Sequence, residues 1–115
     1  MTLESATYPF THLENKLMKT IPSFRLVPEP LSEEAANLPK FRWAADDIGK
    51  RHKLGGVPDF IQSEDWPICP DCGAKMTFYA QLDSINDEFI IADCGMIYIF
   101  ICFECNAVEA RVHSY

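Results

Sequence analysis

Positive charge is scarce in the second half of this chain of 115 residues. Residues 54–115 hold two basic residues, Lys75 and Arg111, against ten acidic residues. That half therefore carries a formal charge of −8, the first 53 residues carry +1, and the whole chain carries −7. Because nucleic-acid binding depends on Lys and Arg displacing counterions from phosphates, the deficit argues against nucleic acid as the ligand of the second half.

Long apolar runs and catalytic motifs are also missing. The longest apolar run covers residues 94–103, about half of what a membrane-spanning helix needs. The first twenty residues lack the basic start and apolar block of a secretory signal, so we expect a cytoplasmic protein without a membrane segment. No nucleophile elbow, phosphate loop or H-E-x-x-H occurs, so we name no catalytic residue and do not expect an enzyme.

The composition predicts one globular α+β domain over residues 1–115. Hydrophobic residues make up 48% and charged residues 23%, which is ordinary for a folded chain of this length. Residues 1–50 form a part expected to contain helix. Thr11 and Glu14 make a capping box before a helix over residues 12–20, whose apolar stripe is Leu13, Leu17 and Ile21. Ser32 is expected to cap a second, short helix.

Residues 53–115 read as a mainly antiparallel β sheet. Strands are expected over residues 76–83, 89–92, 96–102 and 108–113, with shorter strands over 24–26, 41–43 and 59–62. In the first long strand the alternation places Met76, Phe78, Ala80 and Leu82 on one face. Gly55 and Gly56 mark a turn or a close approach of two backbones.

Four cysteines have the spacing of metal ligands. Cys69 and Cys72 form one C-x-x-C pair, and Cys102 and Cys105 form a second pair 29 residues further on. Two such pairs in one small domain are typical of a tetrahedral zinc site, which would make a zinc-ribbon-like pair of knuckles. Gly73 and Asn106 follow the pairs, and both residue types tolerate the left-handed conformation that such turns need.

We interpret this site as structural zinc and keep two alternatives. Four cysteines close the coordination sphere and leave no position for water or substrate, which argues against catalytic zinc. Disulfides are one alternative, although nothing in the sequence indicates an oxidising compartment. Thiol–disulfide redox chemistry at Cys69 and Cys72 is the other, although the expected strand after Cys72 replaces the helix that usually activates such thiols.

The remaining candidate residues have ordinary structural explanations. We expect Cys94 to be a small buried residue between strands. The three histidines, His12, His52 and His113, are scattered along the chain. Three acidic residues near the expected strands suit turns better than a cation site or an acid–base pair: Asp83, Asp87 and Asp93. A third functional alternative is binding of single-stranded nucleic acid by the basic cluster with nearby aromatic residues: Lys50, Arg51, His52 and Lys53, with Phe41, Trp43 and Trp66.

Three segments in residues 53–115 resemble the YwqG-like family of largely uncharacterised bacterial proteins. Residues 53–62 read K-L-G-G-V-P-D-F-I-Q, similar to that family's GG-x-P-x-x-x-Q segment. Residues 76–83 resemble its F-L-x-Q-I-D strand, and residues 93–100 resemble its D-x-G-x-x-x-x-F strand. A Gly-Gly-x-Pro segment, cysteine pairs and an F-x-x-Q-L strand also occur together in programmed cell death protein 2.

The resemblance implies a protein-binding role and no established enzymatic activity. Some relatives look like immunity proteins, and programmed cell death protein 2 resembles a chaperone-like binder of a ribosomal protein. Partners of both kinds are often basic, and the acidic second half of this chain would complement such a protein. The sequence leaves a homodimer open.

Overall fold

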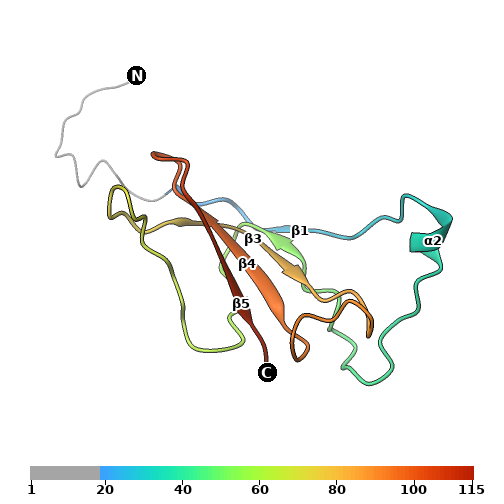
Figure 1. Cartoon of the computed structure of the whole chain (residues 1–115). Coiled ribbons are helices and arrows are strands. Elements are labelled where there is room, and N and C mark those ends of the chain that lie inside the picture. Colours follow the sequence, from blue (N-terminus) through green and yellow to red (C-terminus); the bar gives the residue numbers. More distant parts are fainter. Residues whose placement is uncertain (1–18) are drawn as a thin grey trace.

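The computed structural model describes residues 19–115, which form one five-stranded antiparallel sheet. The strands follow each other in chain order across the sheet, so the fold is a meander (Figure 1). The elements are β1 (Phe24–Arg25), α2 (Glu33–Ala36), β2 (Lys53–Leu54), β3 (Thr77–Asp83), β4 (Met96–Ile101) and β5 (Val108–His113). The three longest strands come from the second half of the chain, and β1 adds an edge from the first half.

The α+β prediction is wrong, because the described residues are almost entirely sheet and loop. The one helix among residues 19–115 is α2, with four residues. Ser32 caps it as predicted, since the Ser32 hydroxyl accepts a hydrogen bond from Ala35 N–H at 3.0 Å. Most of the helix expected over residues 12–20 lies outside the described residues, and the described Lys19 and Thr20 are not helical. Figure 1 shows α2 far from the strands on an extended excursion of the chain.

The second half follows the predicted strands except at residues 59–62 and 89–92, which are loops. Before the second of these segments, the Asn86 side-chain oxygen accepts hydrogen bonds from the N–H groups of Glu88 and Phe89, each at 3.0 Å. This local turn competes with strand pairing for the same backbone groups. The strand expected over residues 41–43 is also absent, and Trp43 there is 87% exposed.

A bulge in β3 overturns the predicted alternation of its side chains. The register with β4 shifts between Phe78 and Ala80, so the residue between them, Tyr79, is extra. One extra residue moves every later side chain to the opposite face. Phe78 therefore shares a face with Gln81 and Asp83, whereas Ala80 and Leu82 lie on the other side.

The register assigns each strand residue to one of two faces, because directly paired residues lie on the same side of a sheet. The covered face consists of Arg25, Lys53, Phe78, Gln81, Asp83, Met96, Tyr98, Phe100, Glu109, Arg111 and His113. The open face consists of Phe24, Leu54, Ala80, Leu82, Ile97, Ile99, Ile101, Val108, Ala110 and Val112, with Thr77 at its corner.

The hydrophobic core lies on the covered face, under the loop between β2 and β3. Phe60 and Trp66 from this loop pack against Tyr98 and Phe100, which are fully buried. The indole N–H of Trp66 donates to the carbonyl of Met76 at 2.6 Å. Burial of the aromatic rings, together with the hydrogen bond of the indole N–H, thus holds the irregular β2–β3 loop against the sheet.

The predicted close approach at the glycine pair is confirmed. Gly55 and Gly56 have positive φ angles of +70° and +74°. A Cβ on Gly55 would lie 2.4 Å from the carbonyl oxygen of Pro22, and Gly56 N–H donates to the carbonyl of Ile21 at 2.7 Å. Any side chain at Gly55 would separate these two segments.

Within residues 19–115 no helix has the length and apolarity to cross a membrane.

Candidate metal centre

The first cysteine pair lies in a tight turn before β3. Cys69 N–H donates to the carbonyl of Ala74 at 2.7 Å, and Gly73 N–H donates back to the carbonyl of Cys69 at 2.9 Å. The N–H of Asp71 points at Cys69 Sγ, 3.4 Å away. Gly73 has a φ angle of +76°, as the sequence predicted. The turn therefore directs backbone donors at the sulfur and holds both thiols on its inner side.

The second pair repeats this turn between β4 and β5. Cys102 N–H donates to the carbonyl of Ala107 at 2.9 Å, and Asn106 N–H donates to the carbonyl of Cys102 at 2.7 Å. Asn106 takes the place of the glycine with a φ angle of +61°. Asparagine is among the few side-chain-bearing residues that tolerate this conformation. Both knuckles were predicted, and both are present.

The sheet brings the two turns together. The four sulfur atoms of Cys69, Cys72, Cys102 and Cys105 all lie within 4.8 Å of one another, and the Sγ atoms of Cys72 and Cys102 are 3.7 Å apart. Cys69 and Cys102 are buried, and Cys72 and Cys105 are half-buried. None of the five cysteines forms a disulfide. The four residues can hold a metal ion, as their spacing predicted.

The thiols differ in their ease of ionisation. Backbone N–H groups of Cys72 and Asp71 stabilise the Cys69 thiolate and lower its pKa to about 7. Hydrogen bonding with Cys72, followed by burial, raises the pKa of Cys105 to about 12. A bound cation would override this difference, because coordination deprotonates all of its thiol ligands.

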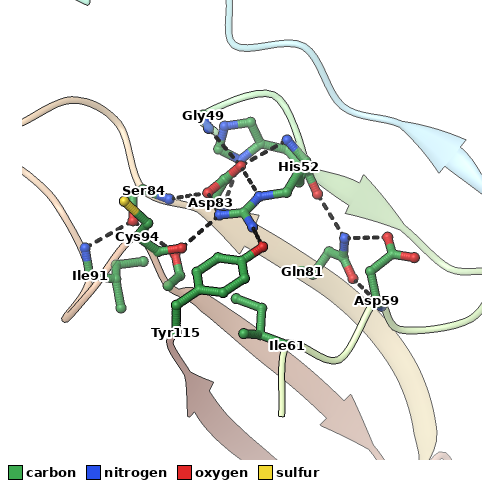
Figure 2. Close-up of polar contacts among 12 residues, drawn as sticks. Gly49, His52, Asp59, Ile61, Gln81, Asp83, Ser84, Ile91, Cys94 and Tyr115 are labelled. Atoms are coloured by element: carbon green, nitrogen blue, oxygen red, sulfur yellow. Dashed lines mark hydrogen bonds and ion pairs between the residues drawn. The ribbon is translucent and has the colours of Figure 1, made fainter. Parts of the chain in front are cut away.

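A second cluster of polar groups lies at the opposite end of β3 and centres on Asp83 (Figure 2). Its buried carboxylate accepts hydrogen bonds from Gly49 N–H at 2.7 Å and from Arg51 N–H at 2.9 Å, and it pairs with the Arg51 guanidinium at 2.7 Å. Ser84 N–H donates to the same carboxylate at 2.7 Å, and Asp83 N–H donates to Nδ1 of His52 at 3.0 Å. Burial opposes ionisation, but the Arg51 and backbone donors outweigh it and hold the pKa of Asp83 below its usual range.

The same network reaches the loop that covers the core. Gln81 donates to the carbonyl of Arg51 at 2.8 Å and to the carboxylate of Asp59 at 2.9 Å, and it accepts from Asp59 N–H at 3.0 Å. The Tyr98 hydroxyl donates to the carbonyl of Asp59 and accepts from Ile61 N–H. The Gln81 contacts join β3 to two loops (Figure 2), and the Tyr98 contacts join β4 to one of these loops. The cluster therefore holds the structure in place and contains no arrangement of a nucleophile and a base.

The sequence missed this cluster, because its partners are 32 residues apart and follow no motif. The three acidic residues considered together do not meet there. Asp83 binds Arg51, whereas Asp87 accepts from Arg42 at the surface and Asp93 lies in an exposed turn. Ordinary structural roles thus account for them.

The basic cluster is largely neutralised by neighbouring carboxylates. Arg51 pairs with Asp83, and Lys53 pairs with Asp59 at 3.0 Å. A cavity of 420 Å³ lies beside these residues, lined by Ser23, Arg25, Asp47, Lys50, Arg51, His52, Lys53 and Asp59. Trp66 is occupied by the core and does not join Trp43 in a stacking platform.

Cys94, His52 and His113 lie outside the thiol cluster. Cys94 lies in the turn before β4 with a φ angle of +54° and is half-buried, so it is more accessible than predicted. His52 and His113 are both buried, and His113 lies at the end of β5 remote from the knuckles. His12 lies outside the described residues.

Comparison with known proteins identifies the family. Residues 3–105 match the family described as "Domain of unknown function (DUF1963)", so the chain belongs to it. A protein of Salmonella typhimurium described as "Uncharacterized protein YpfL" is 44% identical over 55 residues, which are 46% of this chain and 12% of that protein. The match thus spans about an eighth of the relative's length. No solved structure matches the chain significantly.

Proposed function

We propose that this chain is a zinc-stabilised protein-binding domain whose partner is a basic protein. The convergence of four cysteine sulfurs within 4.8 Å carries the proposal, because it offers a closed site for one ion. The ion would join the two knuckles, which are separated by the whole of β3 and β4. Its chemistry would be structural, because all four positions of a tetrahedral ion would be occupied by protein thiolates.

The sulfur spacing suits a tetrahedral ion with four thiolate ligands, such as zinc. A tetrahedral ion with Zn–S bonds of about 2.3 Å separates its sulfur ligands by about 3.8 Å. The observed separation of 3.7 Å between the Sγ atoms of Cys72 and Cys102 is close to that value. The first knuckle also supplies a backbone donor to a thiolate, the N–H of Asp71 at Cys69 Sγ.

The distribution of charge supports a basic partner. Of the two cations in residues 54–115, Arg111 pairs with Asp65 and Glu109, and Lys75 lies over the ring of Trp66. Five exposed carboxylates of that half form no ion pair within residues 19–115: Glu64, Asp71, Glu88, Asp93 and Glu104. Four thiolates around a divalent ion add two further negative charges at the knuckles. Similarity to the YwqG-like proteins and to programmed cell death protein 2 points to the same class of role.

Redox activity is the second candidate, favoured by the lowered pKa of Cys69. Against it, Cys69 is only 1% exposed, so a protein disulfide has no access to its sulfur. Alkylation with iodoacetamide near neutral pH separates the two functions. A metal-loaded structural site protects the four cysteines of the cluster from alkylation, whereas a redox pair leaves one of those four thiols reactive.

Native mass spectrometry tests the metal, and salt-dependent capture tests the partner. We expect one zinc ion per chain, removed by a strong chelator. Immobilised metal-loaded protein should retain basic proteins, and rising salt should release them. Retention should fall in the double variant Asp71→Lys with Glu104→Lys and persist in the control Glu33→Lys with Glu34→Lys, which changes the charge equally on remote α2. Salt-independent retention of neutral or acidic proteins would contradict the proposal.

A further inference from the structure

One face of the sheet carries an apolar side chain at every paired position except Thr77, and nearly half of these positions are exposed. A single row crosses all five strands with no polar residue: Phe24, Leu54, Ala80, Ile99 and Ala110. The neighbouring rows are Leu82–Ile97–Val112 on one side and Thr77–Ile101–Val108 on the other. The open face thus carries no charged side chain, although the chain has a net charge of −7.

An antiparallel sheet with one face in water normally alternates apolar and polar residues. This sheet does not alternate in that way, because both faces are apolar through β4. Val108 and Val112 on the open face are 59% and 56% exposed, and Phe24 is 53% exposed. Within residues 19–115 the face is partly covered, since Thr77 and Ala80 are buried and Leu54, Ile97, Ile99 and Ile101 are half-buried. At its corner the Thr77 hydroxyl donates to the carbonyl of Lys19 at 2.6 Å. An apolar patch of this extent marks an interaction surface.

We infer that the open face packs against the same face of a second copy of this chain, forming a two-fold symmetric dimer. Two copies that each carry −7 repel each other wherever charged surfaces meet. The open face lets them meet without opposing any charges. A basic partner gains nothing there, because the face offers no carboxylate to complement it.

The size and shape of the face suit this occupant. The three long strands have six or seven residues and span about 20 Å along their length, and the five strands together span about 20 Å across the sheet, although β1 and β2 have two residues each. Packing two such faces would remove on the order of 1,000 Å² from water, near the lower limit for a specific interface. In the central row the half-buried Ile99 stands beside the exposed Ala110, so each isoleucine can fit over Ala110 of the other copy. A two-fold interface requires this kind of self-complementarity.

Sedimentation equilibrium of the purified, metal-loaded full chain tests the dimer. From about 1 µM to about 200 µM we expect the mass to approach twice the chain mass of 13.1 kDa. Val108→Glu on the open face should weaken the dimer at least about 100-fold, because it buries an unpaired charge. Val57→Glu is the matched control, since Val57 is 70% exposed in the β2–β3 loop and its variant should dimerise normally.

Val112→Glu at a second exposed position guards against misfolding of the first variant. Metal content and circular dichroism equal to the parent establish that each variant is folded. A parent protein that stays monomeric at the highest concentration would overturn the inference, as would folded variants that dimerise like the parent. The test uses this chain alone, so it can fail while the proposed basic partner stands.

Discussion

The two ends of the central strand pair are held by different chemistry. At one end, where β4 leads into Cys102, four thiols from two turns converge. At the other end, Asp83 binds Gly49 and Arg51 of the segment before β2, and Arg51 also donates to the carbonyl of Cys94 in the turn before β4. The Asp83 end is complete with protein groups alone, whereas the thiol end would reach its full stability only with the proposed ion. Loss of metal should therefore destabilise the thiol end of the sheet alone. Acid should destabilise both ends, because it protonates the thiolates at one end and Asp83 at the other.

Metal removal is expected to cause the largest loss of stability, and to cause it at the thiol end. Metal binding contributes roughly 10 kcal/mol or more to the folding of small structural sites, so a strong chelator should abolish cooperative unfolding of the knuckle end. Cys105→Ser should reproduce the effect without chelator. Thermal unfolding followed by circular dichroism, with zinc measured on the same samples, provides the readout. Unchanged melting after complete metal loss would mean that the sheet holds both ends without an ion.

Asp83→Asn is expected to have the next largest effect, at the other end. Removing one partner of a buried ion pair costs about 3–5 kcal/mol, because the Arg51 charge is left poorly compensated. The control is Asp87→Asn, whose partner Arg42 has 78% of its side chain exposed. That surface pair should contribute about 0–1 kcal/mol. Urea denaturation at neutral pH measures both variants, and equal losses would contradict the assigned difference.

The pH dependence of the Asp83 variant sharpens the same test. The folded pKa of Asp83 is lowered, so its contribution is fully present above the unfolded value of about 3.9 and is lost as pH falls through the folded value. The stability gap between the parent and Asp83→Asn should therefore close in acid. Taking this difference cancels the acid loss of metal, which affects both proteins alike. If the gap stayed constant down to pH about 2, the stability lost in Asp83→Asn would not come from the charge of Asp83.

The sequence could predict the thiol end better than the Asp83 end, for a physical reason. A metal site needs fixed ligand types at short spacings, so Cys69 and Cys72 can be recognised before any fold is known. An ion pair such as Arg51 with Asp83 follows no spacing and arises only from the register of the sheet. The bulge at Tyr79 was invisible for the same reason, since pairing with β4 determines where the extra residue lies. Strand periodicity predicted β3, β4 and β5 within a residue or so at each boundary.

Cys94→Ser is the smallest expected change and separates the fifth cysteine from the other four. Cys94 lies in the turn before β4, outside the thiol cluster, and its backbone carbonyl accepts from Arg51 at 2.9 Å. Serine keeps that backbone contact, so stability should change by no more than about 0.5 kcal/mol. In metal-loaded native protein, a thiol reagent should count one reactive group per chain, and the variant should show none. Retention of a reactive thiol in Cys94→Ser would mean that one of the four cluster cysteines is free of metal.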